Sequence, residues 1–364
     1  MSRLAEECGA INLSQGFPDF DGPAALRERV GWHTMHGHNQ YAPLPGLPAL
    51  REAIADKVRR LYGREVDPLR EVTVTPGATE ALHCAVSAAI HPGDEAIVFD
   101  PAYDTYEPSV TLNGGVCRHV PLRPPDFAVD WDRVRAAVNA RTRLIILNTP
   151  HNPTGAVWGE DDMHALAELV DASRILLLAD EVYEHVIFDG LEHQSLSRHP
   201  ELARRAFVVS SFGKTYHATG WRIGYCIAPP DLTAEFVRIH QFINFSTNTP
   251  MQYALADFMH VEPEYPLGLG EFYQHKRDLF GRLLAGSGFE LQSCRGTYFQ
   301  LADYSRISGL DDREFAQWLT RECGVAVIPV SVFCREPPDR RLVRFCFAKE
   351  DATLEAAAKR LRGI

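Results

Sequence analysis

Short apolar runs alternate with stretches of helical periodicity through the middle of the chain, and this alternation most constrains the fold. The runs cover residues 71–77, 95–101, 143–150, 174–183, 206–213 and 223–230. They are rich in Val, Ile and Leu without polar alternation, which is typical of strands buried on both faces of a mostly parallel sheet. Intervening stretches such as 79–90 and 160–173 repeat apolar residues every three to four positions. The sequence therefore predicts an α/β fold.

A second, smaller unit is predicted after about residue 263. A long helical stretch at 265–288 leads to strands within 297–304, 325–333 and 341–348, and then to a helix at 350–362. This order is typical of a small α+β domain. A chain of 364 residues is also long enough for two hydrophobic cores.

Composition narrows the class of protein. The formal charge of -11 argues against a nucleic-acid partner, which would need a basic face. We find no run of 18 apolar residues that could span a membrane, and no apolar signal segment near the start. The 8 Cys form no CxxC pair and follow no metal-ligand spacing, so we expect no metal site and reduced thiols in a cytoplasmic protein.

Lys214 lies in SSFGKTYHATGWRIGY (210–225), directly after an apolar run. It could end a phosphate-binding P-loop, carry a cofactor as a Schiff base, or lie in a surface loop. The P-loop needs a glycine five residues before Gly213, and Val208 stands there. A Schiff-base lysine needs a lowered pKa, and nearby aromatic residues and Arg222 could provide it. No GxGxxG, GxSxG or HExxH motif offers another chemistry.

Three other features fit a pyridoxal phosphate site, although each has an ordinary structural explanation. Asp180 ends a very apolar strand and could hold a pyridine nitrogen protonated, or it could cap a turn. TPGATEALH (75–83) places a helix N-terminus after a glycine turn, which suits a phosphate but is also a common connection. Arg344 is a lone cation in an apolar strand and could bind a carboxylate or form a structural ion pair.

Taken together, several ordered blocks resemble the class I pyridoxal-phosphate aminotransferases of fold type I. They are NLSQGFPDF (12–20), NQYAPLPGLPALREAIA (39–55), TPGATEALH, NTPHNPTG (148–155), DEVYEH (180–185), SSFGKTYHATGWRIGY and RFCFAK (344–349). The resemblance covers almost the whole chain and favours the branch of bacterial methionine and kynurenine aminotransferases. It implies a seven-stranded, mostly parallel sheet between helices in a large domain (39–262), a small domain (263–364), and an N-terminal segment (1–38) that is an arm and part of the small domain.

The resemblance also implies roles around the cofactor. Lys214 would form the Schiff base, Asp180 would pair with the pyridine nitrogen, and Tyr183 would bind the ring hydroxyl. Tyr183 can reach the site only if the chain turns after Asp180, because residues three apart in a strand point to opposite faces. Asn152, before a cis proline, would bind the ring oxygen and the substrate carboxylate. The expected phosphate ligands are Gly77, Ala78, Thr79, Ser211 and Arg222.

Other implied roles concern the substrate and the dimer. Tyr103 would stack on the cofactor ring, and Tyr41 would reach the phosphate in the neighbouring subunit of a homodimer. Arg344 would bind the substrate α-carboxylate with the backbone of Gly16. The expected pocket residues, Phe17, Tyr41, Tyr103 and Tyr298, are aromatic, which favours methionine or aromatic amino acids.

The activity implied is a ping-pong transfer of an amino group from an L-amino acid to a 2-oxo acid, with Lys214 as general base. The alternative is a cysteine-conjugate carbon–sulfur β-lyase, which would use the same lysine and expel a leaving group from Cβ.

Overall fold

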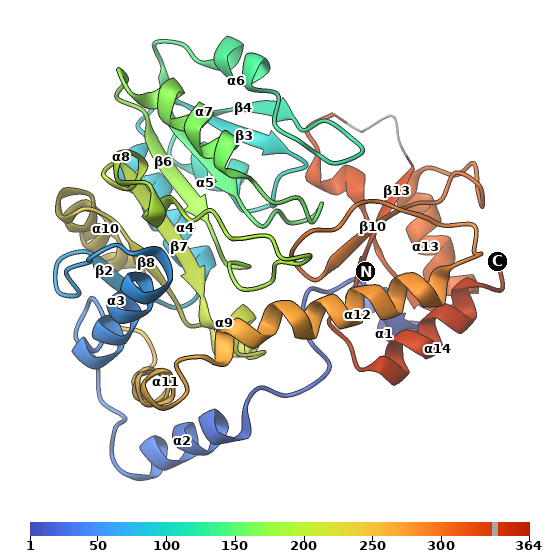
Figure 1. Cartoon of the computed structure of the whole chain (residues 1–364), viewed down its shortest axis with the longest axis horizontal. Helices are drawn as coiled ribbons and strands as arrows, with labels where there is room; N and C mark the ends of the chain where they lie inside the picture. The colour runs from blue at the N-terminus through green and yellow to red at the C-terminus, as the bar shows by residue number, and fades with distance from the viewer. Residues whose placement is uncertain (337–340) are drawn as a thin grey trace.

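The chain folds into two lobes, and the larger one contains the sheet predicted from the apolar runs (Figure 1). The computed structural model describes residues 1–336 and 341–364, and within them this sheet has seven strands in the order β2-β8-β7-β6-β5-β3-β4. The strands are β2 (Val72–Thr75), β3 (Glu95–Asp100), β4 (Val116–Pro121), β5 (Thr142–Asn148), β6 (Leu176–Asp180), β7 (Ala206–Ser211) and β8 (Gly224–Ile227). Only the pairings of β8 in this sheet are antiparallel. The predicted mostly parallel α/β sheet is confirmed.

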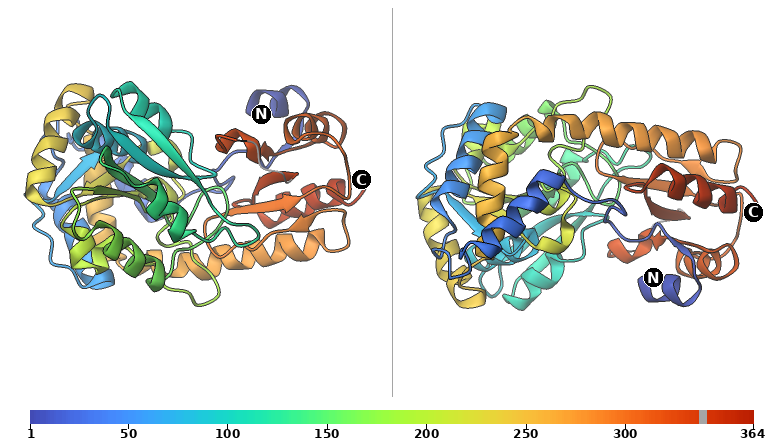
Figure 2. Two further views of the ribbon diagram at one scale, coloured as in Figure 1. Left: turned by 90° about the horizontal axis from the view of Figure 1, so that it is seen from above. Right: turned by 90° about the horizontal axis from the view of Figure 1, so that it is seen from below.

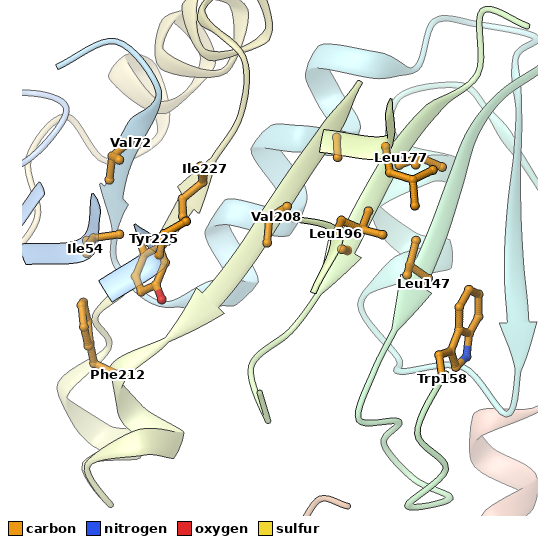
Figure 3. Packing of buried hydrophobic residues seen from close by; sticks show 14 of the residues in the cluster. Ile54, Val72, Leu147, Trp158, Leu177, Leu196, Val208, Phe212, Tyr225 and Ile227 are labelled. Carbon is orange, nitrogen blue, oxygen red and sulfur yellow. The ribbon is translucent and has the colours of Figure 1, made fainter. Parts of the chain in front are cut away.

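Helices cover both faces of this sheet. In β5, Ile145 and Leu147 belong to one buried cluster, whereas Leu144 and Ile146 belong to another. The first cluster, part of which Figure 3 shows, includes residues of α3 (Pro48–Tyr62), α7 (Glu160–Val170) and α11 (Thr249–Val261). The second includes residues of α4 (Ala78–Ala89), α5 (Tyr106–Leu112) and α10 (Pro230–Ile243). Burial on two faces explains why the strands show no polar alternation.

Several elements differ from the predicted ones at their ends. The run at 174–183 is a strand only to Asp180, and the chain then turns through residues 182–185. The run at 206–213 is a strand only to Ser211, where the short helix α9 (Phe212–Thr215) begins. β4 had no counterpart among the apolar runs, because it is a half-exposed edge strand with Arg118 and His119 in its middle.

The smaller lobe has its own core of aromatic and aliphatic side chains. Its sheet has the order β12-β13-β10-β9, from β9 (Glu290–Leu291), β10 (Phe299–Asp303), β12 (Ile328–Pro329) and β13 (Leu342–Cys346). Its helices are α13 (Asp312–Glu322), α14 (Asp351–Leu361) and part of α12 (Leu269–Leu284), which runs along both lobes (Figure 2). The predicted α+β character is therefore observed.

The N-terminal segment joins the smaller lobe before the chain crosses to the larger one (Figure 2). β1 (Ile11–Asn12) pairs in parallel with β11 (Val325–Ala326). The remaining helices are α1 (Ser2–Glu7), α2 (Ala24–Met35), α6 (Trp131–Ala137) and α8 (Pro200–Ala203). The division of the chain at residues 38 and 262 stays a prediction. Of the helices in the described part of the chain, none has the length and apolar character needed to cross a membrane.

Candidate active site

A cavity of about 140 Å³ lies where β5, β6 and β7 end, at the edge predicted to collect ligands. It is lined by nine of the residues predicted for the site: Ala78, Thr79, Tyr103, Asn152, Asp180, Tyr183, Ser211, Lys214 and Arg222. A larger hollow of about 470 Å³ beside Tyr62 is lined by none of the predicted site residues. The smaller cavity is therefore the candidate active site.

Lys214 reaches this cavity from α9, immediately after β7. The helix begins at Ser211, whose hydroxyl accepts a hydrogen bond from the Gly213 N–H at 3.2 Å. The Lys214 Nζ donates to the Gly16 carbonyl oxygen at 3.2 Å and lies 5.7 Å from the centre of the Tyr183 ring. The Lys214 amine is therefore held inside the cavity, between the Gly16 carbonyl and the Tyr183 ring.

The surroundings of Lys214 favour its neutral amine. Burial lowers the pKa of Lys214 to about 8, and the charges of Arg222 and Arg344 act in the same direction. Cys346 and Asp180 act against them. A neutral amine is the form that attacks a carbonyl carbon, so this lysine is suited to Schiff-base formation.

Asp180 ends β6 on the floor of the same cavity. Its carboxylate accepts hydrogen bonds from the Tyr106 hydroxyl at 2.7 Å and from the Val182 N–H at 3.3 Å. Burial raises the pKa of Asp180 to about 6, which the Tyr106 hydrogen bond partly opposes. A buried carboxylate of this kind would gain stability from a cation in the cavity, as a protonated pyridine nitrogen would provide.

The N-terminus of α4 forms a cradle for an anion on the other side of the cavity. Gly77 precedes the helix with a φ of +90°, and no side chain caps the first N–H groups. A Cβ at Gly77 would lie 2.6 Å from the Arg222 Nη2. That guanidinium approaches the Thr79 hydroxyl at 3.5 Å and has no carboxylate partner among the residues that the structure describes. Free helix N–H groups and an unpaired arginine suit a phosphate.

Arg344 supplies a second cation site at the small-lobe side. It lies in β13 with only 6% of its surface exposed. Its Nη1 donates to Asn152 Oδ1 at 2.7 Å and its Nη2 to the Ser14 carbonyl at 3.2 Å, whereas the buried Nε has no partner among the described residues. Within residues 1–336 and 341–364 no carboxylate pairs with it. The alternative of a structural ion pair is therefore not observed among these residues, and a carboxylate ligand suits the site.

The loop at Gly16 and Phe17 closes the cavity from the small lobe. The Gly16 carbonyl accepts from the Tyr298 hydroxyl at 2.7 Å as well as from Lys214, and the Phe17 carbonyl accepts from Lys349 Nζ at 2.8 Å. Tyr298 is fully buried, so it holds this loop in place and does not line the open cavity. Phe17 remains half-exposed beside it.

Tyr41, another predicted site residue, does not line the cavity. Its side chain is 82% exposed and makes an edge-to-face contact with Phe245 at 5.3 Å. A single chain therefore leaves Tyr41 without a role, as expected if it serves a neighbouring subunit.

Two polar residues that hold the site together were absent from the predicted set: Asn148, which lines the cavity, and Tyr106, which lies behind Asp180. Asn148 Oδ1 accepts from the Asn152 N–H at 2.7 Å and its Nδ2 donates to the Asp180 carbonyl at 2.8 Å. Its position at the end of an apolar run was a usable signal. Tyr106, the partner of Asp180, gave no such signal because α5 alone brings it there. The predicted cis bond before Pro153 is present.

Comparison with known proteins finds aminotransferases that match nearly the whole chain. The family model described as "Aminotransferase class I and II" matches residues 9–361. Methionine aminotransferase of Escherichia coli K12 is 54% identical over 364 residues, with 100% of this chain and 94% of that protein covered. Kynurenine–oxoglutarate transaminase 3 of mouse is 34% identical, with 99% of this chain and 86% of that protein covered.

Solved structures show the same relationship. The structure of YbdL from Escherichia coli, described as having a methionine aminotransferase function, matches with a TM-score of 0.98 and 53% identity over 100% of this chain and 96% of that one. N-succinyldiaminopimelate aminotransferase from Mycobacterium tuberculosis matches with a TM-score of 0.96 and 41% identity, covering 100% and 95%.

Proposed function

Because the chain belongs to the class I and II aminotransferases, we propose that it binds pyridoxal 5′-phosphate at Lys214 and transfers the amino group of methionine, or of an aromatic amino acid, to a 2-oxo acid. That it is an amino-acid aminotransferase follows from its family and its relatives. The cofactor, the preferred substrate and the residue roles are the proposal. The observation that carries it is one cavity that holds Lys214, Asp180 and Arg222 together.

The residues of the cavity fit pyridoxal phosphate at each of its functional groups. Arg222, Ser211, Gly77, Ala78 and Thr79 would hold the phosphate. Asp180 would hold the pyridine nitrogen. Asn152 and Tyr183 would bind the ring hydroxyl, and Tyr103 would stack on the ring. The fit is supported by the uncapped helix, the unpaired Arg222 and the buried carboxylate of Asp180.

Lys214 would move the proton of the reaction. The bound cofactor supplies an electron sink that makes the Cα proton of the amino acid acidic. As a free amine with a lowered pKa, Lys214 would remove this proton as a general base. Arg344 and Asn152 would bind the α-carboxylate and so orient the Cα–H bond toward Lys214.

The neighbourhood of Arg344 supports an apolar or aromatic side chain on the substrate. The Arg344 guanidinium lies 3.9 Å from the centre of the Phe299 ring and 4.9 Å from that of Phe333. Neither ring offers a partner for a second carboxylate. Methionine is also the substrate in the names of the Escherichia coli relatives. The relatives reported above are named as aminotransferases, so no observation favours the carbon–sulfur β-lyase.

A homodimer is the proposed assembly, with Tyr41 reaching the partner's phosphate site. Phe242 is 86% exposed, and Phe245 is half-exposed beside Tyr41. Exposed aromatic side chains in one region are typical of a protein–protein interface. A cytoplasmic location is also proposed, since all eight cysteines are free.

The visible absorption spectrum of the purified protein tests the proposal. We expect a band of lysine-bound cofactor that L-methionine, added without an oxo acid, converts to the band of the aminated cofactor. Persistence of the first band would reject methionine as substrate and leave the cofactor assignment intact. Absence of any band after adding pyridoxal phosphate would reject Lys214 as its site. Release of free ammonia would instead identify a lyase.

A further inference from the structure

We infer that His240 is a positioning residue whose positive charge neutralises Glu80 behind the phosphate cradle, and that it thereby sets the affinity for the cofactor phosphate. The inference rests on the proposed binding of pyridoxal phosphate. It concerns a residue outside the cavity, on α10, that no predicted motif included.

Both ring nitrogens of His240 face oxygen atoms. The side chain is fully buried. Its Nδ1 lies 2.8 Å from Glu80 Oε1, and its Nε2 lies 3.2 Å from the Leu44 carbonyl oxygen. A carboxylate and a carbonyl oxygen only accept hydrogen bonds. With Glu80 ionised, both contacts are hydrogen bonds only when the imidazole carries two protons and a positive charge, and this is the arrangement that the inference assigns.

Glu80 carries a negative charge close to the N-terminus of α4, where the cofactor phosphate would bind. It lies in the first turn of α4, next to Thr79, and only 10% of its side chain is exposed. Its second oxygen, Oε2, is buried without a partner among the described residues. A carboxylate here stabilises the helix N-terminus, but it has the same sign as a phosphate bound at that terminus. In a poorly screened interior the repulsion extends over several ångströms.

Cys84 contacts the same carboxylate without adding charge. Its thiol donates to Glu80 Oε1 at 3.0 Å, and burial raises the pKa of the thiol above its usual range. The possible ligand atoms of Glu80, Cys84 and His240 lie within 4.8 Å of one another, as a metal site would need. However, both nitrogens of His240 already face acceptors, and Glu80 Oε1 accepts twice. An ion pair accounts for these contacts, and Cys84 provides a neutral control.

The bond to Leu44 also ties the ion pair to the segment that carries Tyr41. Alternate carbonyl oxygens of this segment accept hydrogen bonds from α10 and from the residues that follow it. Gln40 accepts from the Thr249 hydroxyl at 2.6 Å, and Ala42 accepts from the Ser246 hydroxyl at 3.0 Å. Leu44 accepts from His240. His240 is thus fixed from two sides, and it has no freedom to turn its charge away from Glu80.

The test compares two compounds that differ only in the phosphate, pyridoxal 5′-phosphate and pyridoxal. Each is titrated into the full chain after removal of cofactor, and binding is followed by absorbance. For His240→Gln, which removes the charge and keeps a donor, we expect affinity for pyridoxal phosphate to fall on the order of tenfold. Affinity for pyridoxal should change little.

Three further variants separate charge from packing. Glu80→Gln should keep or raise the affinity for pyridoxal phosphate, and Glu80→Gln with His240→Gln should restore it to near the original value. Cys84→Ala should leave the ratio of the two affinities unchanged. Glu80→Gln alone still tests the charge effect if His240→Gln does not fold.

The outcomes distinguish this inference from the proposed function. Equal losses for the two compounds, or a double variant as weak as His240→Gln, would overturn the electrostatic role of His240. A weaker affinity of Glu80→Gln for pyridoxal phosphate would also overturn it. Failure of the unaltered chain to bind either compound would instead overturn the cofactor proposal.

Discussion

Arg222 and Arg344 are cations at one cavity, and neither has a carboxylate partner within the described ranges. Arg344 is buried, and a buried charge without a partner is costly unless a ligand supplies the opposite charge, whereas Arg222 is exposed and presents its guanidinium to the cavity. The phosphate and the substrate carboxylate of the proposed reaction would supply two anions. The arrangement explains why Arg222 and Arg344 should have separable functions.

Replacing Arg344 by lysine tests its proposed role. Arg344→Lys keeps the charge and loses the planar fork that binds both carboxylate oxygens. We expect the KM for L-methionine to rise about tenfold or more, with cofactor affinity unchanged. Arg222→Lys is the matched control and should lower cofactor affinity with little change in KM at saturating cofactor. If both variants affect KM alone, the assignment of Arg222 to the phosphate is wrong.

The lowered pKa of Lys214 predicts how fast the chain captures its cofactor at different pH values. The amine is protonated and unreactive below a pKa of about 8 and neutral above it. We expect the rate constant for formation of the visible band to rise with pH and level off above about pH 8. In Arg344→Gln the midpoint should move to higher pH, because one lowering charge is lost. A rate that still rises at about pH 10 would indicate an ordinary lysine.

At the scale of elements, the approach of the glycine turn to Arg222 shapes the phosphate cradle. Gly77→Ala places a Cβ at a φ of +90° and 2.6 Å from Arg222 Nη2. We expect a loss of about 1 kcal/mol in the free energy of unfolding and a cofactor affinity at least about tenfold weaker. Gly93 has the same φ of +90° and no neighbouring atom within 4 Å of a Cβ.

Gly93→Ala therefore separates backbone strain from the clash with the guanidinium. It should lose similar stability in denaturant unfolding and keep its cofactor affinity in titration. Equal affinities for the two alanine variants would show that Arg222 tolerates a side chain at Gly77.

The strands and helices of the large lobe were predictable because burial on two faces leaves an unbroken apolar signal. The half-exposed edge strand β4 carries Arg118 and His119 and lacks that signal. The apolar periodicity also did not predict the local turns, such as the short helix α9 and the turn after Asp180.

The residues of the candidate site also fall into some that the sequence predicts and some that it does not. Asp180 and Lys214 stand beside apolar runs and were visible from the residues themselves. Tyr183 and Asn152 were assigned only by family resemblance, because both lie in turns that follow strands and strand alternation does not predict where they point. Tyr106 lies 2.7 Å from the Asp180 carboxylate, and His240 lies 2.8 Å from the Glu80 carboxylate. Both contacts join elements far apart in the sequence, so no local sequence pattern predicts them.

At the scale of the whole molecule, the two lobes meet at the candidate site, whereas Tyr41 is exposed and does not line it. The Gly16 loop from the N-terminal segment and Arg344 from the smaller lobe close the cavity of the larger lobe. Tyr41 and Phe245 form an exposed aromatic pair on the larger lobe. In the proposed homodimer this pair would be covered, and each site would be completed by both chains.

Subunit complementation tests this exchange directly. Lys214→Ala should bind cofactor without turning over, and Tyr41→Ala should lose activity through weaker phosphate binding. A heterodimer of the two variants, purified through two different tags, contains one site with an intact Lys214. If Tyr41 acts across the interface, the Lys214→Ala subunit supplies its tyrosine to that site, and we expect about half of the unaltered activity. If Tyr41 acts within its own chain, the same site has alanine at this position and the heterodimer stays as weak as the Tyr41→Ala homodimer. A chain that sediments as an active monomer would exclude the exchange altogether, because its site would then be complete without Tyr41 from a partner.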